Sequence, residues 1–262
     1  MEAMTTPHLF ASTPRRFDPT HPVLEGIPLR TDPPDPNGIS AQLWKQFQWV
    51  ADTSLKTDFI QGINNGTLSP VSYGQYTVQD AVYCDSVIKD YVAARDRAET
   101  TGLHDLALFL EARRASYASY TSQMMVAWHL RDATCIYPGT EMGDYIAHEH
   151  RITQLYHPIY TIVSMIPCSM LWAWLANNLQ STIKPTSIYR FWVAENLSWQ
   201  GAYALANFVD VWFKKNPYDK AKAEDAFGGS MVGECKAFMA ATKLPAPPVR
   251  VAEMAMSGQG LA

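Results

Sequence analysis

The segment Ser69–Tyr91, SPVSYGQYTVQDAVYCDSVIKDY, has the spacing of an amphipathic α-helix. One face of this helix collects residues at steps of three or four positions, namely Tyr73, Tyr76, Asp80, Tyr83, Val87 and Tyr91. A carboxylate therefore lies within a stripe of aromatic and apolar side chains, where an ionised group is costly unless it is paired or hydrogen-bonded. Two interpretations fit Asp80. It accepts hydrogen bonds from tyrosines or pairs with an arginine of a neighbouring helix, or it lines a cavity and binds a polar ligand.

The residues on both sides of this segment continue the helical pattern. Ser69 is a suitable N-cap and Pro70 a suitable first helical residue, so the central helix is expected to begin there. Ser40 is the expected N-cap of the first helix, and Pro167 is expected to break a later one. The expected helices cover residues 40–56, 58–68, 69–102, 103–131, 141–156, 159–180, 187–215 and 216–243. No alternating strand pattern and no glycine-rich phosphate loop occurs, so the sequence predicts an all-α fold.

The chain is expected to contain one helical domain and two flanking segments. Proline is concentrated in residues 1–38, which show little periodicity and are expected to form an extended or disordered arm. Residues 39–245 form the expected helical domain. Residues 246–262 are expected to be a loose, flexible tail.

Composition and charge argue against several classes of protein. With 262 residues, 47% of them hydrophobic and 18% charged, the chain has the composition of a folded globular protein. The net charge is −4 and no dense run of Lys or Arg occurs, so a nucleic-acid partner is not expected. No stretch of about 18 uncharged apolar residues predicts a membrane span, and the apolar run 161–179 is interpreted as a pair of buried helices. Four widely spaced cysteines and an N-terminus without a signal peptide favour the cytoplasm.

Metal binding is not expected. A di-iron site in a helical bundle needs carboxylate and histidine ligands from several helices, and no histidine follows His157. The cluster His148-Glu149-His150 is interpreted as a solvated helix face, because adjacent residues of a helix point in different directions.

Two further polar residues lie in apolar surroundings. Cys168 follows Pro167 at an expected helix start, where the helix N-terminus would lower the pKa of the thiol and make it nucleophilic. The alternative is that Cys168 is a packing residue. Glu234 continues an apolar stripe with Met231 and Phe238, so a carboxylate again occupies a position typical of a hydrophobic residue.

Together these segments resemble the TenA family, also called thiaminase II, of the haem-oxygenase-like superfamily. The resemblance covers residues 40–243 and is carried by Phe59-Ile60-Gln61-Gly62, Gly66-Thr67-Leu68, Tyr73-x-x-Tyr76-x-x-x-Asp80-x-x-Tyr83, Pro167-Cys168 and the helix of Glu234. It implies a haem-oxygenase-like helical bundle that assembles as a homo-oligomer, a dimer or a tetramer. It also implies an enzyme that acts on a small molecule without a metal or an organic cofactor.

The resemblance assigns roles to individual residues. Asp80 is similar to the family's pyrimidine-binding aspartate, Cys168 to its nucleophile and Glu234 to its acid/base. Tyr83 and Tyr145 resemble tyrosines of the substrate pocket. In the implied reaction the thiolate adds to an electron-poor aminopyrimidine, the glutamate moves protons, and water releases the product.

Two positions depart from the family pattern. Trp172 stands where the family usually has a tyrosine beside the thiol, and Asn196 where it has a tyrosine that stacks on the ring. Both are expected to line the pocket together with Tyr76, so the pocket should differ from the family's in shape and polarity.

These observations leave more than one function open. The first hypothesis is an aminopyrimidine aminohydrolase or thiaminase II of thiamin salvage. The second is a repurposed member of the family in secondary metabolism, a cofactor-free cyclase or isomerase that acts on a larger apolar substrate and does not need Cys168. A regulatory or ligand-binding protein without activity is the third.

Overall fold

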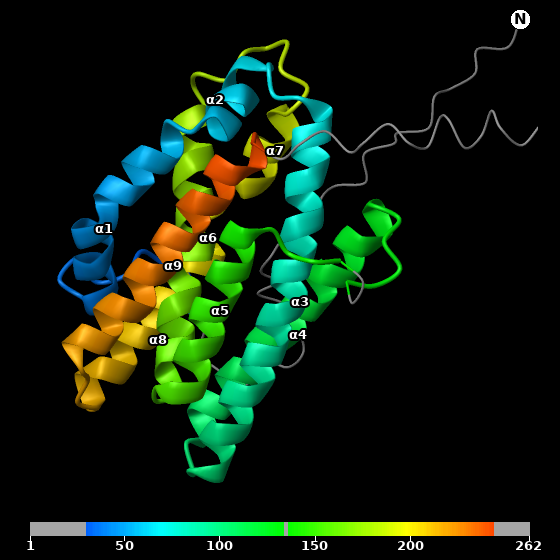
Figure 1. The fold of residues 1–262 in the computed structure, drawn as a ribbon. Coiled ribbons are helices and arrows are strands. Elements are labelled where there is room, and N and C mark those ends of the chain that lie inside the picture. The colour runs from blue at the N-terminus through cyan, green and yellow to red at the C-terminus, as the bar shows by residue number, and fades with distance from the viewer. Residues whose placement is uncertain (1–29, 134–135, 244–262) are drawn as a thin grey trace, which may run out of the picture.

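Nine α-helices form the part of the chain that the structure describes, a computed structural model covering residues 30–133 and 136–243 (Figure 1). In chain order they are α1 (Ile39–Leu55), α2 (Asp58–Asn65), α3 (Pro70–Thr100), α4 (His104–Ala127), α5 (Thr140–Leu155), α6 (Ile159–Leu179), α7 (Arg190–Asn196), α8 (Gln200–Lys215) and α9 (Lys220–Ala241). These described residues contain no β-strand, which confirms the predicted all-α fold.

The flanking segments are described only in part. Of the expected arm, only residues 30–38 are described, and they contain a turn but no helix. The side-chain amide of Asn207 on α8 donates to the backbone carbonyls of Arg30 and Asp32 and so binds this segment to the helices. Residues 1–29 of the arm and the whole expected tail, 246–262, lie outside the described residues. The expected helical domain is described up to residue 243, except for residues 134–135.

The central helix α3 follows the sequence prediction closely. The Ser69 hydroxyl accepts the backbone N–H of Val71, and Pro70 is the first helical residue. A serine cap followed by proline satisfies the start of a helix, where backbone N–H groups otherwise lack partners. On the predicted face Tyr73 is half-buried, and the other five residues are buried.

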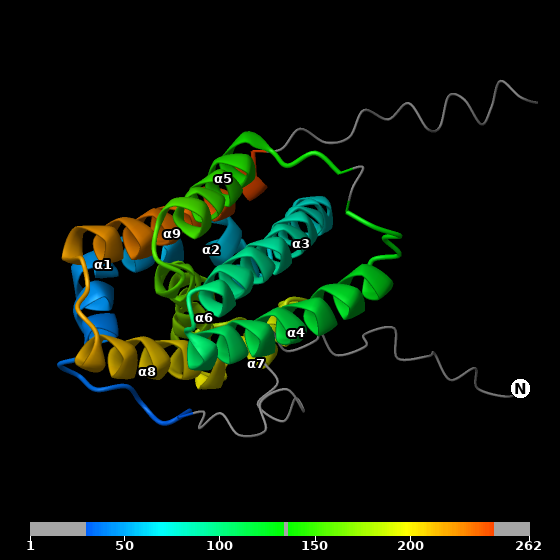
Figure 2. The same ribbon diagram turned by 90° about the horizontal axis from the view of Figure 1, so that it is seen from below.

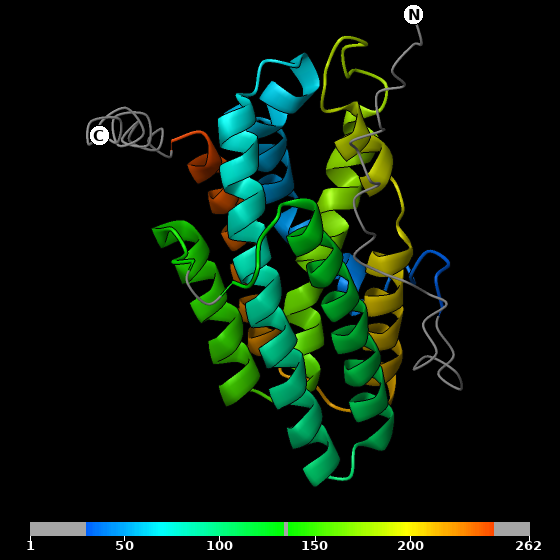
Figure 3. The same ribbon diagram turned by 90° about the vertical axis from the view of Figure 1, so that its right-hand side faces the viewer.

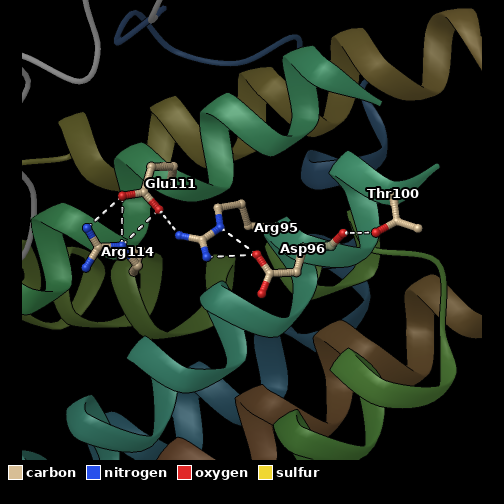
Figure 4. Close-up of polar contacts among 5 residues, drawn as sticks. All are labelled: Arg95, Asp96, Thr100, Glu111 and Arg114. Atoms are coloured by element: carbon tan, nitrogen blue, oxygen red, sulfur yellow. Dashed lines mark hydrogen bonds and ion pairs between the residues drawn. The ribbon is translucent and has the colours of Figure 1, made fainter. Parts of the chain in front are cut away.

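Helices α3 and α4 form a long antiparallel hairpin (Figure 3). Near its turn, Arg95 of α3 lies 2.5 Å from Glu111 of α4, which also pairs with Arg114 at 2.6 Å (Figure 4). Figure 4 also shows the ion pair between Arg95 and Asp96. One turn after Asp96, the Thr100 hydroxyl donates to the backbone carbonyl of Asp96. These side chains are partly exposed, so water and salt screen the pairs and each contributes little to stability.

Helix α6 lies in the middle of the bundle. Seen from the end, α5, α9, α1, α8, α4 and α3 surround it (Figure 2). By length and composition α6 would be able to cross a membrane, but 89% of its most apolar window is buried inside the fold. Its apolar character is therefore that of a core helix, which is consistent with a soluble protein.

The predicted break at Pro167 is wrong. Proline removes one backbone hydrogen bond inside a helix and tends to kink it, but α6 continues as a single helix from Ile159 to Leu179. Neighbouring helices bury nearly the whole surface of α6, so packing outweighs the lost hydrogen bond. The expected pair of buried helices is one buried helix.

Several other expected boundaries differ from the structure: the last helix begins at Lys220 rather than at residue 216, and α4 ends at Ala127 rather than at residue 131. At two more boundaries, contacts with distant segments accompany the difference. Gly38, rather than Ser40, is the N-cap of α1. Ser40 lies inside the first turn, and its backbone N–H and hydroxyl both donate to the carboxylate of Asp210 on α8, at 3.0 and 2.9 Å. The single helix expected over residues 187–215 is divided into α7 and α8, and Asn177 of α6 donates to the carbonyl of Leu197 between them.

Candidate functional site

Four helices bring titratable side chains together in the centre of the bundle. Tyr83 comes from α3, Tyr145 from α5, Cys168 from α6 and Glu234 from α9, and all four are buried. The rings of Tyr83 and Tyr145 stack with their centroids 4.7 Å apart, and their hydroxyl oxygens are 2.9 Å apart. Sequence positions that span most of the domain therefore meet at one place.

Glu234 is held by two side chains that the sequence analysis placed in the pocket. The Tyr145 hydroxyl donates to Glu234 Oε1 at 3.3 Å, and the Trp172 indole N–H donates to Oε2 at 3.2 Å. Both oxygens of this buried carboxylate thus have a donor. Trp172, the position that was expected to depart from the family pattern, thus helps to hold this carboxylate in place.

Asp80 and Tyr76 lie on the same face of α3 as Tyr83. Asp80 is buried, and Tyr120 of α4 donates to its Oδ2 at 3.4 Å. This contact agrees with the first interpretation of Asp80, in which the carboxylate accepts a hydrogen bond from a tyrosine. The Tyr76 ring lies one turn before Asp80 and faces the Trp172 ring at 6.1 Å.

Aromatic rings form a wall around Trp172. Its ring centroid is 5.4 Å from that of Trp192 and 6.0 Å from that of Phe238, and Phe238 also stacks on Tyr76 at 5.5 Å. Trp192, which belongs to α7, was not predicted as a site residue. A buried tryptophan four residues before Asn196 on the same helix is the signal that could have indicated it.

Asn196 contacts this cluster through the backbone of its own helix. It is half-buried at the end of α7, and its side-chain amide donates to the carbonyl of Trp192 at 2.7 Å. The structure therefore uses the amide to close the last turn of α7. The ring of Trp192, rather than the side chain of Asn196, reaches the other predicted residues.

Cys168 lies in the interior of α6 and not at its N-terminus. It is fully buried, and the Tyr117 hydroxyl of α4 donates to its sulfur at 3.6 Å. Because Pro167 does not start a helix, the expected lowering of the thiol pKa by a helix N-terminus does not apply.

Glu149 belongs to the site, although the sequence analysis placed it on a solvated face. It is completely buried, with Oε1 3.1 Å from the Tyr83 hydroxyl and 3.2 Å from the Ser230 hydroxyl of α9. For Glu149 that interpretation is wrong, because α5 packs with one face on α3 and α9, whereas His150 is exposed as expected. The buried residues of α5 recur at helical spacing (Met142, Tyr145, Glu149, Ile152 and Thr153), and this spacing could have revealed Glu149.

Small residues on α9 allow α5 to approach closely enough to form the site. A Cβ atom added to Gly233 would lie 2.4 Å from the Tyr145 ring, and one on Gly229 would overlap the ring of His148. Outside this contact, a surface pocket of about 390 Å³ opens between the two helices, with Tyr145 and Gly233 in its lining. The Tyr145 ring therefore separates this pocket from the buried cluster.

Burial determines the electrostatics of the cluster. It raises the pKa of Tyr83 and of Tyr145 well above the usual value for tyrosine, and nearby negative charge on Cys168 and on the glutamates acts in the same direction. Burial also raises the pKa of Glu149. Both tyrosines are therefore neutral donors at physiological pH. Within the described residues, no three side chains of His, Cys, Asp or Glu are grouped as metal ligands.

Several solved structures match the arrangement of helices in this chain, and they share one fold. A TenA homologue from P. horikoshii superimposes with a TM-score of 0.66 at 16% identity, over 79% of this chain and 99% of its own. The chain has the TenA-like fold. This confirms the expected haem-oxygenase-like architecture.

Two further structures have the same fold under different names. A TenA family transcription regulator from Silicibacter has a TM-score of 0.64 at 13% identity, over 80% of this chain and 99% of its own. A TenA-like protein from Sulfolobus solfataricus, whose name suggests a thiaminase, has a TM-score of 0.53 at 16% identity, over 80% and 99%. No protein-family model and no curated protein matches the sequence. At these identities the likeness establishes the fold, and the function has to be argued from the site.

Proposed function

We propose that the protein is a cofactor-independent TenA-like enzyme that hydrolyses a C–N bond of an aminopyrimidine. The observation that supports this proposal is the convergence of a thiol, an acid/base carboxylate and a second carboxylate on one aromatic cluster. Cys168 and Glu234 both act electrostatically on Tyr145, and Asp80 lies one turn before Tyr83 on α3. Each residue type matches one requirement of the reaction.

Cys168 would be the nucleophile and Glu234 the acid/base. The ionised sulfur of Cys168 forms a bond to the carbon that carries the leaving nitrogen, and the C–N bond breaks as Glu234 gives a proton to the departing amine. A water molecule then forms the C–O bond, the C–S bond breaks, and the proton released by the water returns to Glu234. The reaction consumes one water molecule and needs no oxidant or reductant.

Asp80 would bind the pyrimidine. Its carboxylate accepts from Tyr120 at Oδ2, and an ionised carboxylate can accept several hydrogen bonds at once. An aminopyrimidine presents an amino group and a protonatable ring nitrogen side by side, which suits a carboxylate. The rings of Tyr76 and Trp172 supply apolar walls on which a flat heterocycle packs well.

The test is turnover of 4-amino-5-aminomethyl-2-methylpyrimidine and of thiamin by the purified protein, followed by mass spectrometry. We expect product from the wild-type protein and none from Cys168→Ala. The matched control is Cys84→Ala, which removes another fully buried thiol from α3. Absence of turnover, or turnover that survives Cys168→Ala, would contradict the proposal.

A second candidate function is a cofactor-free cyclase or isomerase of a larger apolar substrate. The aromatic wall of Trp172, Trp192 and Phe238 favours it, because such walls hold an apolar molecule in a reactive shape. Under this function Cys168→Ala would keep its activity. The effect of the same substitution on turnover therefore separates the two candidates.

A further inference from the structure

We propose that Glu149 is an internal proton store, which exchanges a proton with Glu234 through the hydroxyl groups of Tyr83 and Tyr145. This inference rests on the acid/base role proposed for Glu234. It adds a positioning residue that does not itself touch the substrate. The four side chains form a continuous chain of oxygen atoms between two buried carboxyl groups.

The number of hydrogens needed along this chain of oxygen atoms indicates that one of the two carboxyl groups is protonated. Three oxygen–oxygen contacts link the four groups, with lengths of 3.1 Å from Glu149 to Tyr83, 2.9 Å from Tyr83 to Tyr145 and 3.3 Å from Tyr145 to Glu234. Each contact needs one hydrogen, and each phenol supplies only one. Two tyrosines therefore satisfy two of the three contacts. The third hydrogen has to come from a carboxylic acid at one end of the chain.

The surroundings of the two carboxyl groups place this proton on Glu149. Glu234 receives the Trp172 indole N–H at Oε2, a donor that favours the ionised carboxylate. Glu149 takes part in no ion pair with the described residues, and its Oε2 is buried without a hydrogen-bond partner. An ionised carboxylate with one unsolvated oxygen is far more costly than a neutral acid.

The charges around Glu149 agree with this assignment. Burial disfavours ionisation of Glu149 most, and negative charge on Asp90 and on Glu234 acts in the same direction, outweighing the opposite effect of the Tyr83 and Tyr145 hydroxyls. The titratable and charged groups around Glu149 and its tyrosine partners come from five helices. They are Asp90 and Tyr91 of α3, Arg113 and Tyr117 of α4, Tyr145 of α5, Cys168 of α6 and Glu234 of α9, and the charge of Arg113 acts on Tyr91.

The exchange moves three protons and leaves every contact occupied. Glu149 gives its proton to the Tyr83 oxygen, Tyr83 gives its own proton to Tyr145, and Tyr145 gives its own to Glu234. Glu149 ends ionised, Glu234 ends neutral, and both tyrosines stay neutral throughout. Glu234 can thus recover a proton inside a site that its neighbours shield from water.

Infrared spectroscopy tests the location of the proton without any substrate. A protonated carboxylic acid has a C=O stretching band that is separate from those of carboxylates and amides. We expect this band in the wild-type protein at neutral pH, its loss in Glu149→Gln and its displacement in Tyr83→Phe. Ser230→Ala, which removes the hydroxyl that donates to Glu149 Oε1, is the control and should keep the band. A band that is missing from the wild type, or that is unchanged in Glu149→Gln, would overturn the proposal.

Kinetics tests the exchange with Glu234. We expect Glu149→Gln to lower kcat with little change in KM, by less than the roughly 100-fold expected for loss of the acid/base itself. It should also displace the pH profile of kcat, which a purely structural residue would not do. An unchanged pH profile would contradict the exchange. Failure of the wild type to act on any aminopyrimidine would instead contradict the proposed function, and the infrared result would still decide where the proton lies.

Discussion

At Glu149, a single buried carboxyl group makes the stability of the protein depend on pH. Burial is the main cause of its raised pKa, and the charges of Asp90 and Glu234 add to it. Between the unfolded pKa of a glutamate, about 4.3, and this raised pKa, the folded protein holds a proton that the unfolded chain has released. Stability falls with rising pH wherever the folded state binds more protons than the unfolded state. Glu149 therefore costs stability at neutral pH and not at acidic pH.

The variant Glu149→Gln should remove this cost. Glutamine is close in shape and stays neutral, so it resembles the protonated acid in the folded protein. As the pH rises from about 4 toward neutral, the unfolding free energy of the variant should increase relative to that of the wild type. Urea unfolding at a series of pH values measures it, with Glu224→Gln at a partly exposed position of α9 as the control. A difference that stays constant with pH would show that Glu149 is ionised in the folded protein.

Trp172 is the residue at which we expect the choice of substrate to be decided. Its ring fills the space between Tyr76, Trp192 and Phe238, and its N–H is bound to Glu234. The variant Trp172→Tyr opens space for a ring and returns a hydroxyl to the neighbourhood of the thiol. We expect kcat/KM for an aminopyrimidine to rise.

Steady-state kinetics on the same substrate checks this expectation. Trp174→Tyr is the matched control, because Trp174 lies two residues further along α6 and packs instead on Trp44 of α1 at 6.2 Å. A fall in kcat/KM in Trp172→Tyr but not in Trp174→Tyr would favour the larger apolar substrate.

Among the elements, the contact between α5 and α9 decides the geometry of the site. Gly233 gives α9 a flat surface on which the Tyr145 ring lies, and this brings the Tyr145 hydroxyl to Glu234 one residue further along. Glycine inside a helix lowers its stability by roughly 0.5–1 kcal/mol relative to alanine. The close approach of the two helices is the structural reason for this glycine.

The variant Gly233→Ala should separate the two helices. Its Cβ would lie 2.4 Å from the Tyr145 ring, so the ring or the helix has to move. Overpacking of this kind costs typically 1–3 kcal/mol, and we expect kcat to fall as Tyr145 leaves Glu234. Thermal unfolding and kinetics measure both effects.

The control for this variant is Gly143→Ala on α5. The nearest atom to its added Cβ is 3.8 Å away, in Pro138, which is an ordinary contact. We expect this variant to be as stable as the wild type or more so, because alanine favours the helix. Equal behaviour of the two glycine variants would contradict the role given to the helix contact.

The sequence predicted those elements whose signals are local. The cap at Ser69, the proline at position 70 and the apolar spacing of α3 act within one helix, and the structure has them as expected. Gly66 ends α2 in a left-handed conformation, with φ of 70°, slightly before the expected end at residue 68.

The predictions that failed depend on contacts between distant segments. Asp210 of α8 satisfies the start of α1, so Ser40 is not needed as its cap. Neighbouring helices bury α6 and keep it continuous at Pro167. Glu149 is different, because the spacing of the buried residues on α5 indicates its burial, whereas its link to Tyr83 of α3 depends on the tertiary arrangement.

For the molecule as a whole, the site lies where helices from both halves of the domain meet. Asp80 and Tyr83 come from α3, whereas Cys168 and Glu234 come from α6 and α9. A ligand that contacts all of them binds the folded protein and not the unfolded chain. Its binding free energy therefore adds to the stability of the bundle.

Thermal unfolding should consequently report substrate binding. An aminopyrimidine at 100 times its Kd adds about 2.7 kcal/mol of stability, which for a domain of this size raises Tm by roughly 5 to 10 °C. Cys168→Ala should show the same rise, because it removes the nucleophile and leaves the binding groups. Asp80→Asn should lose most of the rise, because a neutral amide no longer attracts the protonated ring nitrogen.

The control for Asp80→Asn is Asp85→Asn, which changes a more exposed carboxylate on the same helix, paired with Lys89. It should leave the rise in Tm unchanged. If Asp80→Asn keeps the full rise while Cys168→Ala loses it, the thiol and not the carboxylate holds the pyrimidine. The division of roles between binding by α3 and chemistry by α6 and α9 would then be wrong.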